Sequence, residues 1–104
     1  MLTFEEALDA LGLEPEYVDA TITRVVTQKM AAAHDTLRGA VGYDVDERMP
    51  DDPRVKELEG IYLDDLYSNR GLSAKVTVAT RALVYTMEAQ LRLELRRMRE
   101  AASV

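Results

Sequence analysis

Apolar residues recur at intervals of three or four positions along most of this chain, which is the spacing of one face of an α-helix. The longest run lies between Val18 and Leu37 and predicts a long helix ending near Gly39. The run consists of Val18, Ile22, Val25, Val26, Met30, Ala33 and Leu37. Glycine and proline are few, which argues against a turn-rich β architecture.

A shorter helix is predicted before this one. Thr3 and Glu6 have the spacing of a capping box, in which each side chain accepts a hydrogen bond from the backbone of the other residue. Gly12 is a suitable stop, because glycine adopts the left-handed conformation that ends many helices. The apolar stripe of this helix consists of Ala7, Leu8 and Leu11.

Two further helices are predicted in the second half of the chain. Asp51 or Asp52 can cap the first of them, with Pro53 in its first turn, and it should end near residues 69–71. Its stripe consists of Val55, Leu58, Ile61, Tyr62 and Leu66. After a connector, the last helix should begin near Ala79. Its stripe consists of Leu83, Met87, Leu91, Leu95 and Met98.

Residues 40–51, AVGYDVDERMPD, mix glycine, proline and acids without a helical period, so we expect a long loop there. The predicted fold class is therefore all-α, a small bundle of about four helices. It combines a short N-terminal helix, two or three longer helices and the loop near residues 40–51. The length of 104 residues fits a single domain over residues 1–104.

The composition and the absence of certain segments indicate the cellular compartment in which the chain is expected. Cysteine is absent, so neither a disulfide nor a thiolate metal site can form. The N-terminal stretch lacks a basic region followed by an apolar run, and no apolar stretch is long enough to span a membrane. We therefore expect a cytosolic protein without membrane contact.

Charge is unevenly distributed along the chain, whose net charge is -6. Residues 1–20 carry six acids and no base, residues 44–65 carry nine acids and three bases, and residues 66–104 carry three acids and seven bases. The net negative charge disfavours nonspecific attraction to DNA or anionic lipid. If the acidic and basic regions lie on different faces, copies of the chain can meet head to tail. The alternative is that they are ordinary solvated helix faces.

Residue types that carry chemistry are scarce. His34 is the only histidine and has no clustered carboxylate near it in the sequence, so we interpret it as a partly exposed helix residue. The pairs Asp51–Asp52 and Asp64–Asp65 are better explained by capping and solvation than by a cation site. The glycines form no nucleotide-binding motif. We therefore expect no catalytic, cofactor-binding or metal site, no cofactor and no enzymatic activity.

We therefore expect this chain to function by binding other protein chains. The candidate interface residues are Arg70, Arg92, Arg96, Arg99, Tyr43, Asp46 and Glu47. The arginines of the last helix are interleaved with glutamates, which argues against dense phosphate binding. Because the helix macrodipole also favours cations at a C-terminus, a structural role and an intersubunit role both stay open for them.

Over nearly the whole chain, the order of features resembles the head-to-tail connector (adaptor) family of long-tailed bacteriophages. The opening MLTFEEALDALGL resembles the short first helix of that family, and a long second helix and a variable acidic loop follow. A proline-started helix then ends in an L-Y-x-N-R box, and the last helix carries a Q-L-R element. The family-like motif residues are Leu66, Tyr67, Asn69, Arg70, Gln90, Leu91 and Arg92.

The resemblance implies a structural virion protein of the neck between head and tail, made in the cytoplasm of the bacterial host. Its copies would form a ring of about a dozen subunits. The ring would dock on the portal protein of the filled capsid and on a tail-side neck or head-closure protein, and DNA would pass through without specific binding.

Within the L-Y-x-N-R box, Asn69 or Gly71 can end the helix while Tyr67 covers the edge of the core. We expect Arg70 to pair with an acid in its own chain or in the next subunit. The alternative function for the whole chain is a small acidic helical regulator, which would bind protein or nucleic acid through its C-terminal helix.

Overall fold

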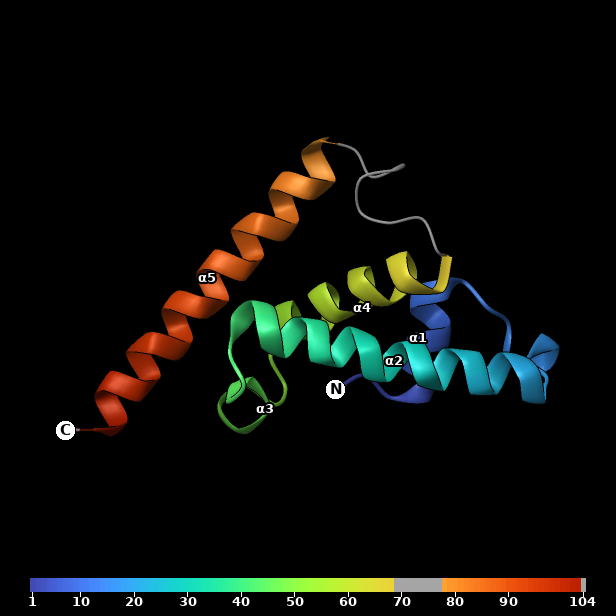
Figure 1. Cartoon of the computed structure of the whole chain (residues 1–104), viewed down its shortest axis with the longest axis horizontal. Helices are drawn as coiled ribbons and strands as arrows, with labels where there is room; N and C mark the ends of the chain where they lie inside the picture. Colours follow the sequence, from blue (N-terminus) through green and yellow to red (C-terminus); the bar gives the residue numbers. More distant parts are fainter. Residues whose placement is uncertain (69–77, 104) are drawn as a thin grey trace.

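The computed structural model of the chain describes residues 1–68 and 78–103, and every regular element in these residues is a helix (Figure 1). The predicted all-α fold class is confirmed. The motif residues Asn69 and Arg70, and most of the connector predicted before the last helix, lie outside the described residues.

Helix α1 (Phe4–Leu11) begins and ends as the sequence predicts. The backbone N–H of Glu6 donates to Thr3 Oγ1 over 3.1 Å, and the N–H of Thr3 donates to Glu6 Oε1 over 2.9 Å. Gly12 has a φ of 70°, the left-handed conformation that ends the helix. The helix packs against the rest of the bundle through its buried residues Ala7 and Leu8.

A 3₁₀ turn, η1 (Pro15–Tyr17), leads into the long helix α2 (Ala20–Val41). The N-cap of α2 is Asp19, whose Oδ1 accepts a hydrogen bond from the backbone N–H of Ile22 over 2.8 Å. This bond satisfies one of the backbone donors that every helix leaves open at its start.

Helix α2 continues two residues beyond the stop predicted at Gly39. Val41 is buried, so the extra residues remove an apolar side chain from water. The helix ends at Gly42, where φ is 152°, a conformation that residues with a side chain rarely adopt. The true stop is therefore the second glycine.

The segment predicted as a loop, residues 40–51, contains one turn of helix, α3 (Val45–Arg48). Val45 is fully buried and Met49 is 4% exposed. These two apolar residues, four positions apart, hold the turn against the bundle, because one helical turn brings both to the same side. The segment is thus packed on its own chain.

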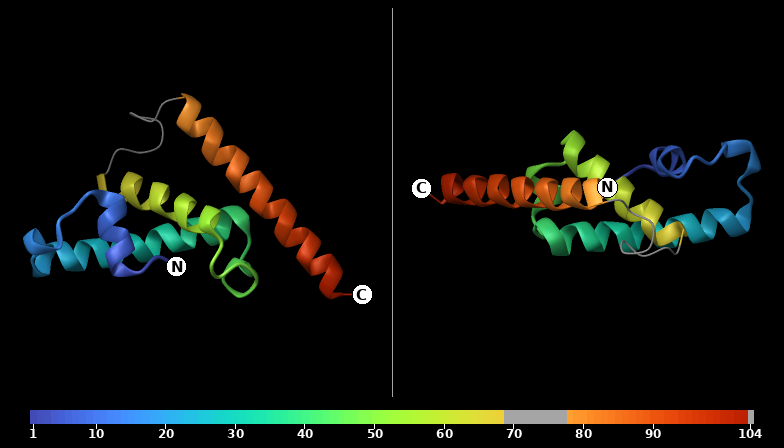
Figure 2. Two further views of the ribbon diagram at one scale, coloured as in Figure 1. Left: turned by 180° about the vertical axis from the view of Figure 1, so that it is seen from behind. Right: turned by 90° about the horizontal axis from the view of Figure 1, so that it is seen from above.

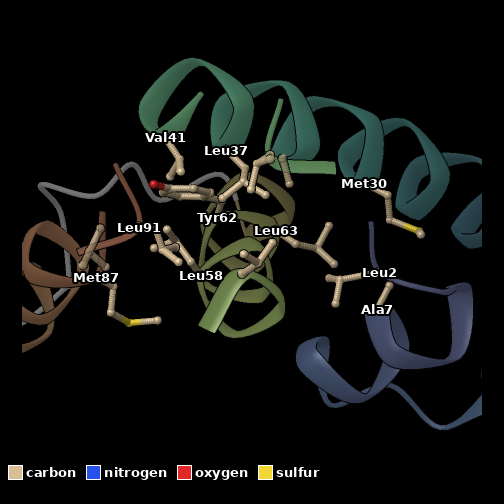
Figure 3. Close-up of a cluster of buried hydrophobic side chains, with 14 of the residues drawn as sticks. Leu2, Ala7, Met30, Leu37, Val41, Leu58, Tyr62, Leu63, Met87 and Leu91 are labelled. Carbon is tan, nitrogen blue, oxygen red and sulfur yellow. The ribbon is translucent and has the colours of Figure 1, made fainter. Parts of the chain in front are cut away.

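Helix α4 (Pro53–Ser68) starts after Asp52, whose Oδ1 accepts from the backbone N–H of Arg54 over 2.9 Å. The side chains that it buries are Val55, Leu58, Glu59, Tyr62 and Leu63. Figure 3 shows the ring of Tyr62 beside Val41 and Leu37 of α2, with Leu58 and Leu63 in the same apolar cluster. The centre of the core therefore lies between α2 and α4.

Helix α5 (Val78–Ala102) crosses one end of the α2–α4 pair, and its C-terminal end projects away from the other helices (Figures 1 and 2). Its buried stripe consists of Val84, Met87, Leu91 and Leu95. None of the helices in the described residues has the length and apolar character needed to cross a membrane.

The prediction that Leu83 lies on this buried stripe is wrong, because its side chain is 50% exposed and Val84 takes its place. Successive helical residues are rotated by about 100°, so a shift of one position moves a side chain off the buried face. Met98, the last residue of the predicted stripe, is 38% exposed, since the helix has by then run past the core.

Candidate protein-binding surface

Helix α5 carries apolar residues on the face turned away from the core as well as on the face that packs. Tyr85 is 62% exposed and Leu93 is 47% exposed, and the exposed Ala89 lies midway between them. Residues four apart lie above one another on a helix, so these three form one stripe, which we call the outer stripe. A helix that is apolar on two opposite faces is typical of one that another chain covers.

An open hollow of about 430 Å³ lies beside the outer stripe, between α5 and the end of α2. It is lined by Val41, Arg92, Leu93, Arg96 and Arg99, and we call it the arginine hollow. Its three arginines are among the candidate interface residues that the sequence indicates. Their spacing of three and four residues brings them to one side of α5.

Arg99 is tied to its own chain through Asp44. Its Nε donates to Asp44 Oδ2 over 2.8 Å, and its Nη2 donates to the other carboxylate oxygen. Arg48 also donates to Asp44 Oδ2, over 2.8 Å. Hydrogen bonds from Arg99, and then from the Asp44 backbone and Arg48, hold the pKa of Asp44 well below its usual range. This pairing fixes the turn around α3 to the C-terminal part of α5.

The other two arginines of the hollow, Arg92 and Arg96, make fewer contacts within the chain. Arg92 Nη1 donates to the carbonyl oxygen of Ala40 over 2.9 Å. Arg96 Nε lies 3.4 Å from Glu100 Oε1, and both of these side chains are largely exposed. A guanidinium has five N–H donors, so both arginines can bind a further acceptor.

Of the other candidate interface residues, Tyr43, Asp46 and Glu47 do not line the hollow. Tyr43 is 72% exposed, and the guanidinium carbon of Arg38 lies 5.1 Å from the centre of its ring, within the range of a cation–π contact. Asp46 faces α2, and Glu47 is exposed on α3. Arg70 lies outside the described residues.

Some of the described residues of the family-like motif are buried and others are exposed. Leu66 and Tyr67 are half-buried and pack against the core, as expected for the end of a helix that covers its edge. In the Q-L-R element, Leu91 is fully buried while Gln90 and Arg92 are exposed. One residue of that element therefore anchors α5, and its neighbours face outward.

Sequence reasoning missed a polar cluster between α2 and α4. His34 Nδ1 lies 2.9 Å from Glu59 Oε1, and His34 Nε2 lies 2.9 Å from Asp46 Oδ2. Glu59 is 1% exposed, and its Oε2 also accepts from the backbone N–H of Leu2 over 3.2 Å. The cluster links α2, α3, α4 and the N-terminal segment.

A signal for this cluster is present in the spacing of the sequence. Glu59 lies four residues after Val55 and four before Leu63, on the apolar stripe of α4. A carboxylate at such a position must be paired or hydrogen-bonded, because burying an isolated charge is costly. His34 occupies the matching position on α2, between Met30 and Leu37.

A second set of ion pairs attaches the outer helices to α4. Arg54 Nη1 and Nη2 donate to the two oxygens of Glu94 on α5 over 2.8 and 2.7 Å, and these bonds hold the pKa of Glu94 below its usual range. Lys56 Nζ lies 3.0 Å from Glu6 Oε2 on α1. The backbone N–H of Thr3 and then Lys56 lower the pKa of Glu6 to about 2.

Within residues 1–68 and 78–103, no group of three or more histidines and acids is placed to hold a metal ion. The outer stripe and the arginine hollow are both exposed on α5. Searches against protein-family models, curated proteins and solved structures found no match to this chain.

Proposed function

We propose that this chain is a structural subunit of an oligomeric ring that connects the portal of a phage head to the tail. The observation that carries the proposal is the outward side of α5, where the outer stripe and the arginine hollow lie side by side on a helix of 25 residues. The order of α1, α2, the acidic turn around α3, and α4 supports it, because this order resembles that of the connector family.

The charge of the chain is compatible with a place around passing DNA. A net charge of -6 gives each subunit a field that repels phosphates on average. A ring of such subunits would not hold the polyanion that slides through it, whereas a basic channel would bind DNA at low salt. Repulsion of this kind favours a conduit over a DNA-binding regulator.

The test is the oligomeric state of the purified chain, alone at high concentration and mixed with the portal protein encoded in the same genome. We expect closed rings in electron micrographs and a matching mass by light scattering. Leu93→Arg, which places a charge in the outer stripe, should reduce ring formation by about tenfold or more. Ala31→Arg, on the exposed side of α2, is the matched control and should form rings normally.

Persistent monomer under both conditions would contradict the proposal. Duplex DNA binding at low salt that falls steeply with salt, and that weakens in Arg96→Ala, would instead support the regulator.

A further inference from the structure

The arginine hollow has positive charge that its own chain does not neutralise. Among the described residues, no carboxylate forms an ion pair with Arg92, which donates only to a carbonyl oxygen. Arg96 has one long contact to an exposed glutamate. The planar guanidinium fork matches the two oxygens of a carboxylate, so the hollow is suited to a ligand with carboxylates.

The hollow also has an apolar part, formed by Val41 and Leu93. An inorganic anion would leave this part in contact with water. A ligand that fills the hollow should therefore combine carboxylates with an apolar group, as an acidic protein segment does.

Such a segment is present at η1 of the same protein. Glu14 and Glu16 are exposed, and Tyr17 is 76% exposed. The backbone N–H of Tyr17 donates to the carbonyl oxygen of Glu14 over 3.0 Å, and Pro15 restricts the backbone between them. Two carboxylates and an aromatic ring are thus held on one short turn. No basic residue occurs in residues 1–20 to neutralise them locally.

The two features lie at opposite ends of the molecule. Figure 1 shows η1 at the end of the α1–α2 side, remote from the C-terminal part of α5, and Figure 2 shows the same separation from two other sides. The molecule is 51 Å along its longest axis. The acidic turn of one chain therefore cannot reach its own hollow, and only a second copy can bring the two together.

We propose that the arginine hollow of one copy binds the acidic turn at residues 14–17 of the next copy. The carboxylates of Glu14 and Glu16 accept hydrogen bonds from Arg92 and Arg96, and the ring of Tyr17 packs on the apolar part of the hollow. Each copy keeps one hollow and one acidic turn to offer, so the contact is head to tail and closes into a ring when the rotation between copies allows. This inference rests on the proposed function.

Charge reversal on either side tests the contact. Arg92→Glu with Arg96→Glu, and separately Glu14→Arg with Glu16→Arg, should each weaken self-association by about tenfold or more in sedimentation velocity. Glu5→Arg with Asp9→Arg makes the same change of charge on α1 and is the control, for which we expect a much smaller effect. The thermal midpoint of each variant shows that it is folded.

Mixing the two reversed variants supplies the sharpest readout. Each variant alone carries two like-charged surfaces, but in the mixture every acidic turn meets a basic hollow and every basic turn meets an acidic hollow. We expect association to return in the equimolar mixture. The proposed contact would be overturned if the charge-reversed variants associated as strongly as the wild type. It would also be overturned if the equimolar mixture stayed monomeric.

A cross-link reports the contact even when association is weak, because the chain has no cysteine of its own. Oxidation of Tyr17→Cys with Leu93→Cys should give a ladder of covalent multimers, whereas Tyr17→Cys with Leu83→Cys should not. Rings that form without this ladder would overturn the contact and leave the proposed ring function standing. Absence of rings, with or without portal, would instead remove the proposed function. Loss of portal binding alone in the hollow variant would show that the portal occupies the hollow, which also overturns the contact.

Discussion

The carboxylate of Glu59 is buried among apolar side chains, and each of its two oxygens has a hydrogen-bond partner. Oε1 faces His34, and Oε2 accepts from the backbone N–H of Leu2. A methionine here has a similar length but no oxygen acceptor, so it would leave both the backbone N–H of Leu2 and the ring nitrogen of His34 without this partner. Removing an acceptor from a buried pair leaves the other group unsatisfied, which is the costly case.

We expect Glu59→Met to lower the free energy of unfolding by about 1 to 3 kcal/mol in urea titrations. Glu57→Met makes the same change on an exposed position of α4 and should alter stability by less than about 0.5 kcal/mol. Equal unfolding midpoints for the two variants would show that the buried carboxylate contributes nothing specific.

Residues whose role depends on near neighbours in the sequence could be predicted. The capping box of Thr3 and Glu6 and the stop at Gly12 involve contacts within a few residues, so spacing alone indicates them. The pair His34–Glu59 could not be derived in the same way, because it joins residues 25 positions apart. Its formation depends on how α2 packs against α4.

At the scale of elements, the apolar period predicted the four longer helices α1, α2, α4 and α5, but it missed α3 and was less reliable for register and ends. Both Leu83 and Val84 precede Met87 at helical spacing, and which of them is buried depends on the angle at which α5 crosses the bundle. In residues 40–51 the helical signal was weak, because Val45 and Met49, the two apolar side chains that hold α3 in place, stand among acids, Gly42 and Pro50.

Replacing each of the two glycines at the end of α2 by alanine should change stability in opposite directions. Gly39 lies inside the helix with open space around it, so Gly39→Ala should raise stability by about 0.5 to 1 kcal/mol. Gly42 has a φ of 152°, and an added Cβ would lie 3.2 Å from Leu95 Cδ1, so Gly42→Ala should lower stability by about 1 to 3 kcal/mol. Thermal unfolding of both variants measures the difference. If Gly39→Ala were the damaging change, the helix would end where the sequence first predicted.

At the scale of the whole molecule, the fold joins charged regions that are separate in the sequence. Asp44 and Arg54 of the acidic stretch 44–65 bind Arg99 and Glu94 of the basic α5. Part of the charge asymmetry along the chain is therefore cancelled within one molecule. The sequence could not indicate which acids would be paired, because that depends on where α5 crosses the bundle. It likewise could not predict the arginine hollow, which α5 forms with the end of α2.

These pairs set how stability responds to acid. The pKa values of Glu6, Asp44, Asp52 and Glu94 are all lowered in the folded chain, by hydrogen bonds from backbone and basic groups. A carboxyl group with a lowered folded-state pKa stabilises the fold above its unfolded-state pKa, and this contribution is lost as the pH falls toward the folded-state value. For Glu6 the window runs from 4.5 down to about 2. We therefore expect stability to fall steeply below about pH 4.

A substitution at Arg54 isolates this effect, because Arg54 lowers the pKa of both Asp52 and Glu94. In Arg54→Met those two pKa values should return toward their usual range, so less stability remains to be lost in acid. We expect Arg54→Met to be less stable than the wild type at pH 7 but to show a smaller drop between pH 7 and pH 3 in urea unfolding. Arg24→Met, which removes the same charge from an exposed position of α2, should keep the full drop. An equal drop in both variants would mean that acid sensitivity arises from general charge repulsion, since that would depend on net charge and not on which arginine is lost.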